Sequence, residues 1–118
     1  TKNTAAGDLL PMAGATFAEP LTSAPSAATP IKARIAADSE KPVGEWNSCD
    51  IVCRGDMIEV TVNGVLQNKI TKVSPAAGRI GFQLEGVAYE LRNVVLQPLL
   101  AIDASYQPAI NRAPGTKP

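Results

Sequence analysis

The stretch GEWNSCDIVCRGDMIEVTVNGVLQNKI, residues 44–70, decides the fold that the sequence predicts. Within MIEVTV the apolar residues Ile58, Val60 and Val62 alternate with other side chains, which is typical of a β-strand with one buried face. Asn63-Gly64 follows, and this dipeptide between alternating runs is a strong hairpin signal because both residues tolerate positive φ. Gly55-Asp56 has turn chemistry as well. The stretch therefore predicts three consecutive antiparallel strands, CDIVCR, MIEVTVN and VLQNKITKV.

The two cysteines of the chain, Cys49 and Cys53, are both in the first of these strands. Four residues of strand span ~13 Å, which exceeds the Cα separation that a disulfide allows, so we expect them not to pair with each other. We interpret them as small buried hydrophobic residues, and a disulfide to another chain is the alternative. Their spacing and the lack of further ligands argue against a redox or zinc site.

The flanking sequence extends the β pattern in both directions. IKARI (31–35) alternates apolar and basic residues, and RIGFQLEG (79–86) places Ile80, Phe82 and Leu84 on one inward face. VAYELRNVVLQPL (87–99) predicts a last strand, with a bulge near Arg92-Asn93 where the alternation changes phase. Short strands joined by turns at this spacing indicate an all-β antiparallel sandwich over residues 31–99.

The two ends of the chain have a different character. Residues 1–30 are rich in Pro, Ala, Ser and Thr, which predicts a segment with short edge strands. Within it, PLTSAPSAATP (20–30) predicts a solvated surface loop, and O-glycosylation of this stretch is the alternative. Residues 100–118 predict an extended tail, either a flexible end or an arm that pairs with something else.

Composition excludes several classes of function. Eleven basic and eleven acidic residues cancel, so the chain lacks the charge that favours nucleic acid, and no apolar run approaches the ~20 residues of a membrane span. The sequence contains no histidine, which removes the commonest metal ligand and the side chain best suited to proton transfer near neutral pH. Catalysis would have to use carboxylates, Tyr, Lys or Cys.

Residues 40–99 resemble the C-terminal half of the 3-keto-disaccharide hydrolase domain family. The resemblance is carried by GEWN, DIVCRGD (50–56), VNG (62–64), GRIGFQLEG and ELRNVVLQPL, which occur in that order. Residues 7–38 resemble the preceding strands of the same family. The resemblance implies a concanavalin-like jelly roll in an extracellular or cell-envelope protein that binds or acts on carbohydrate.

A sugar site needs a flat aromatic ring for stacking and convergent planar polar groups. The predicted carbohydrate-binding residues are Trp46, Gln83, Glu85, Glu90 and Arg92. Each has a structural alternative: Trp46 as a plug at the end of the sandwich, and Glu90 with Arg92 as an ion pair.

Two carboxylates across a cleft would also suit a glycosidase, and Glu85 with Glu90, or Asp56 with Glu59, are the candidates. The sequence cannot give the separation between them, so no catalytic residue is assigned. No metal site is predicted, because GDMIE and AADSE offer too few oxygen ligands, although a structural Ca²⁺ is compatible with lectin-like sandwiches.

Two functions from different classes follow. The first is a non-catalytic carbohydrate-associated module that binds glycan, self-assembles, or both, because a half sandwich leaves edges that a second copy can pair, as a dimer or as a filament. The second is a hydrolase of 3-keto-disaccharides with Glu85, Glu90 and Arg92 near the chemistry. The alternative to assembly is a reduced sandwich capped by its own Pro-rich ends.

Overall fold

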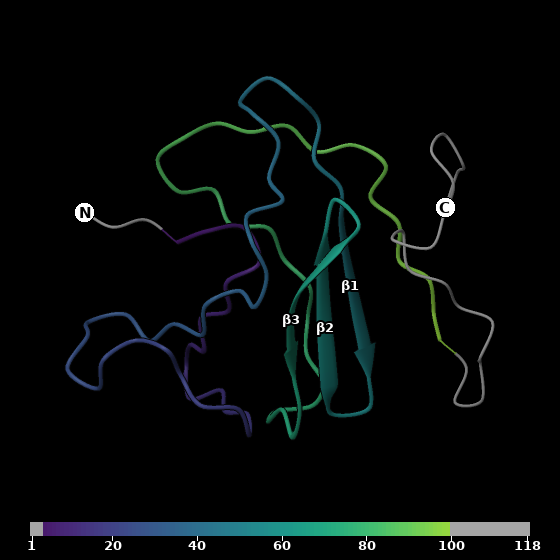
Figure 1. The fold of residues 1–118 in the computed structure, drawn as a ribbon. Helices are drawn as coiled ribbons and strands as arrows, with labels where there is room; N and C mark the ends of the chain where they lie inside the picture. Colours follow the sequence, from purple (N-terminus) through teal and green to yellow (C-terminus); the bar gives the residue numbers. More distant parts are fainter. Residues whose placement is uncertain (1–3, 100–118) are drawn as a thin grey trace.

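The computed structural model describes residues 4–99, and its regular structure is one three-stranded antiparallel sheet (Figure 1). Strand β1 spans Cys49–Arg54, β2 spans Met57–Val62 and β3 spans Val65–Ile70, in the spatial order β1-β2-β3. The described chain forms no helix. The three strands and the all-β class are as the sequence predicted.

Tight turns set the register of the sheet. Gly55 (φ +60°) follows β1 and lets Arg54 pair with Met57, as expected of a two-residue hairpin with Gly at its first central position. Asn63 (φ +49°) and Gly64 (φ +83°) join β2 to β3, and both central residues with positive φ match the Asn-Gly prediction.

A bulge in β3 changes which of its side chains are buried. Val60 pairs with Asn68 and Thr61 with Leu66, so Gln67 is the extra residue in the β3 ladder. Gln67 and Asn68 are adjacent and both are 0% exposed, although simple alternation would place one of them outside. The core around them contains the apolar residues Val60, Val62 and Ile70.

The N-terminal coil lies on the β3 side of the sheet and is held there mainly by polar contacts (Figure 1). The Gln67 amide donates to Ala37 O at 2.7 Å, and the Asn68 amide donates to Gly7 O at 2.9 Å. These bonds satisfy backbone carbonyls of irregular segments that have no ladder of their own. The buried amides therefore act as the connection between the sheet and the coil.

The predicted strand at 31–35 is not formed. Only Lys32 makes a bridge, to Leu9, and the backbone N–H of Arg34 donates instead to the Asp8 carboxylate at 2.8 Å. A side-chain acceptor thus takes the backbone hydrogen bond that the alternation of IKARI predicted for a neighbouring strand.

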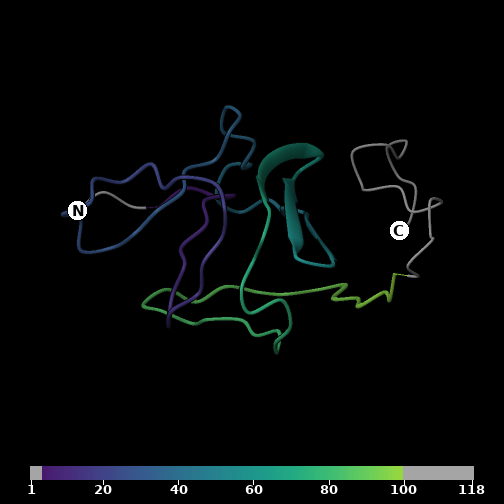
Figure 2. The ribbon, with the colours of Figure 1, turned by 90° about the horizontal axis from the view of Figure 1, so that it is seen from below.

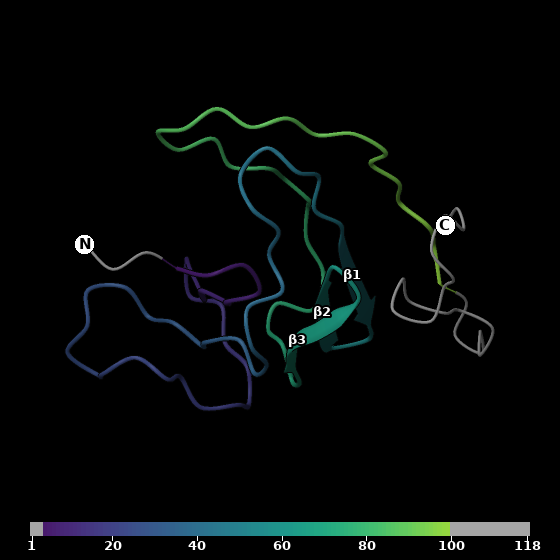
Figure 3. The ribbon, with the colours of Figure 1, turned by 45° about the horizontal axis from the view of Figure 1, so that its top comes forward.

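The predicted strands over 79–86 and 87–99 are also absent, and this part of the prediction was wrong. Residues 80–99 form a long arc over the sheet that continues past β1 (Figures 1 and 3). Seen from below, the arc is separated from the strands (Figure 2). Ile80, Phe82 and Leu84, expected to point inward, are exposed, because no second sheet faces them within residues 4–99. The jelly roll is therefore incomplete in the described part of the chain.

The cysteines follow the prediction in one respect only. Cys49 and Cys53 are both free, as expected, but both are exposed rather than buried. They share a face with Ile51, which is 61% exposed. No helix among residues 4–99 has the length and apolarity to cross a membrane.

Candidate carbohydrate site at Trp46 and Arg92

The structure brings together two of the predicted site residues, Trp46 and Arg92. The guanidinium carbon of Arg92 lies 3.9 Å from the centroid of the Trp46 ring, which is the geometry of a cation–π contact. Trp46 is in the loop before β1 and Arg92 is in the arc of residues 80–99, so the contact joins segments far apart in the sequence. Trp46 keeps 41% of its surface exposed, and part of the ring is therefore accessible at the surface.

The loop that carries Trp46 is held by the amide of Asn63 at the β2–β3 turn. Asn63 Nδ2 donates to Ser39 O and to Asn47 Oδ1, each at 2.7 Å, and Asn63 Oδ1 accepts from Ser48 N at 2.8 Å. Asn47 Oδ1 also accepts from Lys41 N at 2.8 Å. One turn residue thus holds the two residues that follow Trp46, Asn47 and Ser48.

Gln83 and Glu85 form a second polar group on the arc. Gln83 Nε2 donates to Glu85 Oε2 at 3.2 Å, and the Tyr89 hydroxyl donates to Gln83 O at 2.7 Å. Gly86, with φ +81°, allows the chain to reverse between these residues. Tyr89 is an aromatic side chain that the sequence prediction did not include. Its signal was its position beside Glu90 and three residues before Arg92 in AYELR (88–92).

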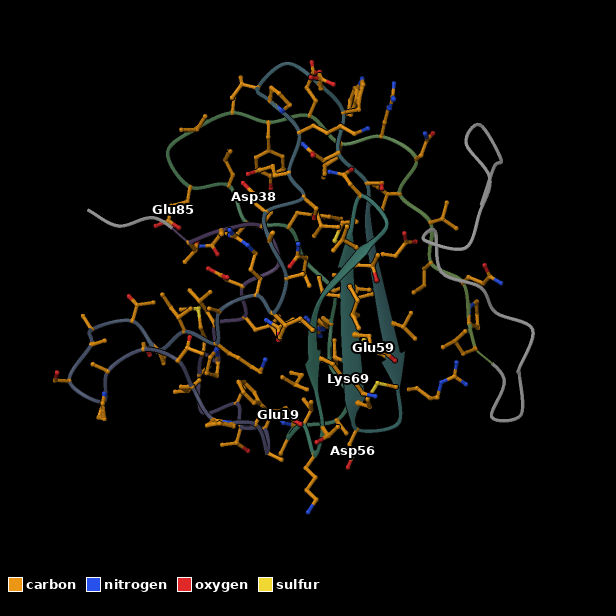
Figure 4. The ribbon with its side chains drawn as sticks, viewed as in Figure 1. Glu19, Asp38, Asp56, Glu59, Lys69 and Glu85 are labelled. Atoms are coloured by element: carbon orange, nitrogen blue, oxygen red, sulfur yellow. The ribbon has the colours of Figure 1, made fainter. Side chains whose placement is uncertain are left out.

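The predicted carboxylate pairs are not joined by any contact. In the described chain Glu90 forms neither an ion pair with Arg92 nor a hydrogen bond with Glu85, and Arg92 contacts Trp46 instead. Asp56 is at the β1–β2 turn and Glu59 is in β2 opposite Lys69, whereas Glu85 is on the arc at a distance from the strands (Figure 4).

A small hollow of about 170 Å³ lies in the N-terminal coil, lined by Pro11, Ala15, Thr16, Phe17, Glu19 and Leu21. It is smaller than the ~300–1,000 Å³ of typical ligand pockets. Its one charged group, the Glu19 carboxylate, accepts from the backbone N–H and the hydroxyl of Thr71, and these bonds lower the pKa of Glu19. We therefore assign the hollow a structural role.

Neither cysteine chemistry nor a metal centre is supported by the geometry. Desolvation, reinforced by the neighbouring Asp50 carboxylate, raises the pKa of the Cys49 thiol, which is the opposite of what a nucleophilic cysteine needs. Among residues 4–99, no three acidic or cysteine side chains are grouped so that they could hold a metal ion. A structural Ca²⁺ stays a prediction.

Comparison with known proteins assigns this chain to a family. Residues 2–97 match the family model described as the 3-keto-alpha-glucoside-1,2-lyase-like domain, so the match includes the Pro-rich N-terminal part as well as the segment that first indicated the resemblance. Neither the curated proteins nor the solved structures contain a significant match. Because the match covers most of its length, the chain belongs to the 3-keto-alpha-glucoside-1,2-lyase-like domain family.

Proposed function

We propose that this chain is a non-catalytic module of an extracellular or cell-envelope protein, and that it binds glycan at Trp46 and Arg92. The observation that carries the proposal is the placement of the Arg92 guanidinium over the Trp46 ring. Family membership supports carbohydrate as the ligand class.

The chemistry of the two side chains suits a sugar. The exposed part of the Trp46 indole offers a flat apolar surface for the C–H face of a pyranose, and a guanidinium presents N–H donors in a fixed plane for hydroxyl groups. Arg92 also restricts the ring, so less conformational freedom is lost on binding. Gln83, Glu85 and Glu90 are on the same arc as Arg92 and stay candidates for further contacts to the sugar.

We favour a binding role over a hydrolytic one. The Glu85 carboxylate already accepts a hydrogen bond from Gln83 Nε2 at 3.2 Å. The sequence has no histidine to serve as an alternative acid or base.

The test is calorimetric titration with glucose-containing disaccharides, both unmodified and oxidised at C3. Because Trp46 is the only tryptophan, its fluorescence reports on the same site directly in the unmodified chain. We expect Trp46→Ala to weaken binding about tenfold or more, and Arg92→Ala to weaken it by several-fold. Met12→Ala, at an exposed position of the N-terminal coil, is the control and should bind as the parent does. Turnover of a 3-keto-disaccharide that disappears in Glu85→Gln would overturn the non-catalytic proposal.

We propose further that the chain associates with itself. Nine of the exposed large hydrophobic residues lie on the arc: Ile80, Phe82, Leu84, Val87, Tyr89, Leu91, Val94, Val95 and Leu96. Apolar exposure of this extent is typical of surfaces that become covered by a partner. Light scattering over a range of concentrations tests this, and a mass equal to one chain throughout would contradict it.

A further inference from the structure

The outer edge of β1 is open. Ser48 O accepts from Asn63 N at 2.9 Å, and Arg54 pairs with Met57 across the two-residue turn, so the alternate residues between them direct their backbone groups toward β2. Cys49, Ile51 and Cys53 consequently direct their N–H and C=O groups away from the sheet. No backbone hydrogen bond reaches them from elsewhere in residues 4–99. Such a row of unpaired groups is a template for another strand.

The apolar face of the sheet also stops abruptly at this edge. Val60 is 6% exposed, whereas Ile51, its register partner in β1, is 61% exposed on the same face. On this face the side chain in β2 is therefore buried, whereas its partner in β1 is exposed. A strand added beside β1 would place a second side chain beside Ile51 on this face, as β1 does for Val60.

We propose that β1 pairs antiparallel with β1 of a second copy of this chain, around a two-fold axis at Ile51, to form one continuous six-stranded sheet. This inference names a surface for self-association that is separate from the apolar side chains of the arc, and it does not rest on glycan binding. In this register the three outward-facing residues meet one another: Ile51 faces Ile51 of the second copy, and Cys49 faces Cys53 of the second copy.

The strand is complementary to itself in this register. Residues 49–53, CDIVC, carry a cysteine at each end and an apolar residue at the centre, so apolar groups meet on one face. On the other face, Asp50 is diagonal both to Arg54 and to Asp50 of the second copy, so the charges there neither favour nor oppose this register. The β3 edge offers no equivalent surface, because Ile35 N donates to Gln67 O at 2.7 Å and Ala18 N donates to Thr71 O at 2.9 Å.

The two cysteines make the register measurable. Residues that face each other as a hydrogen-bonded antiparallel pair have Cα atoms about 5.5 Å apart, within the range of a disulfide. With oxidised glutathione, the two thiols form one interchain disulfide and release two molecules of reduced glutathione. The Cys49 thiol of one chain and the Cys53 thiol of the other would react, whereas identical cysteines of the two chains would be ~13 Å apart.

The experiment is disulfide trapping of the folded chain, read on a non-reducing gel. We expect a cross-linked dimer from the parent chain and little from Cys49→Ser or Cys53→Ser alone. When the two single variants are mixed, a dimer with one chain of each brings Cys53 of one chain opposite Cys49 of the other. Mixing should therefore restore the cross-link to between a third and a half of the parent yield. Equal cross-linking of both single variants by themselves would show random collision and overturn the register.

A second measurement keeps the proposal testable without the cysteines. Ile51→Lys sets two ammonium groups against each other on the two-fold axis and should raise the dimer dissociation constant at least tenfold in sedimentation experiments. Val43→Lys, at an exposed loop position, is the matched control and should leave the constant unchanged. Association that survives Ile51→Lys would overturn this surface but keep self-association. A monomer at every concentration would overturn both, and protection of the Ile51 amide from hydrogen exchange in that monomer would show that another segment of the same chain covers the edge.

Discussion

Thr71 holds the carboxylate of Glu19 with two hydrogen bonds, one from its backbone N–H and one from its hydroxyl, both at 2.7 Å. Ala18 N donates in return to Thr71 O at 2.9 Å. These three bonds attach the N-terminal coil to the chain directly after β3. The contact depends on the ionised carboxylate, since only that form accepts at both oxygens.

The Glu19 contact predicts a pH-dependent part of the stability. The bonds from Thr71, the backbone bond first, lower the pKa of Glu19 below its ordinary value. The contribution is therefore fully present above the pKa of the unfolded chain and is lost as the pH falls through the folded pKa. In urea unfolding between pH 7 and pH 3, we expect Glu19→Gln to show a smaller loss of unfolding free energy on acidification than the parent.

Glu40→Gln is the control for this measurement, because the Glu40 carboxylate is exposed and makes no bond in the described structure. Its pH profile should follow that of the parent. A Glu19→Gln profile parallel to that of the parent would show that Thr71 does not stabilise the ionised carboxylate.

Asn63 is predicted to support both the turn and the Trp46 loop. Asn63→Ala removes the three amide contacts and places a residue that disfavours the left-handed region at φ +49°. We expect it to lower the unfolding free energy by about 2–3 kcal/mol. Asn63→Gly keeps the conformation but not the amide, so it should cost less for the fold while still weakening glycan binding. Equal costs for the two variants would mean that backbone conformation contributes little here.

The buried pair of Lys32 and Asn68 should respond unequally to substitution. The Lys32 ammonium donates to Asn68 Oδ1, and Asn68 Nδ2 donates to the carbonyls of Gly7, Lys32 and Ala33. Asn68→Leu leaves the ammonium and these carbonyls unsatisfied, which we expect to cost about 3 kcal/mol or more. Lys32→Met removes the charge and leaves the amide donors in place, so it should cost about 1 kcal/mol or less. Denaturant unfolding checks the order, and a larger cost for Lys32→Met would contradict it.

Gly7 is predicted to be irreplaceable for a steric reason. Its φ is +100°, and a Cβ there would be 2.5 Å from Cβ of Gln67, which is fully buried. We expect Gly7→Ala to lower the unfolding free energy by about 2 kcal/mol or more, from strain and from displacement of the coil. Gly78→Ala has nothing within 4 Å of the added Cβ and should change stability by less than about 0.5 kcal/mol. Similar thermal midpoints for the two variants would contradict this account.

The sequence predicted the hairpin region well because its signals are local. The alternation around Val60 and the Asn63-Gly64 dipeptide depend only on neighbouring residues, and both are realised. The strands expected at 31–35 and over 79–99 had the same alternation but needed a partner strand or a second sheet, which a local pattern cannot supply. The burial of Gln67 could not be predicted either, because a bulge shifts the side-chain alternation by one residue.

The contact between Trp46 and Arg92 could not be predicted from the sequence. Both residues were proposed for the site, Trp46 in a turn and Arg92 in a predicted strand, and nothing in the spacing indicated that the guanidinium would cover the ring. An ion pair with Glu90 was the structural alternative for Arg92. A cation–π contact between a loop and a distant arc is set by tertiary packing, which composition and periodicity do not encode.

The difference between the two edges of the sheet limits the size of any assembly built through it. At the β3 edge, coil residues already use Gln67 O and Thr71 O as acceptors, while the β1 edge stays open. A sheet with one closed edge accepts a neighbour on one side only. Pairing through β1 therefore ends at two chains, and a fibre would need a different surface, such as the apolar side chains of the arc over residues 80–99.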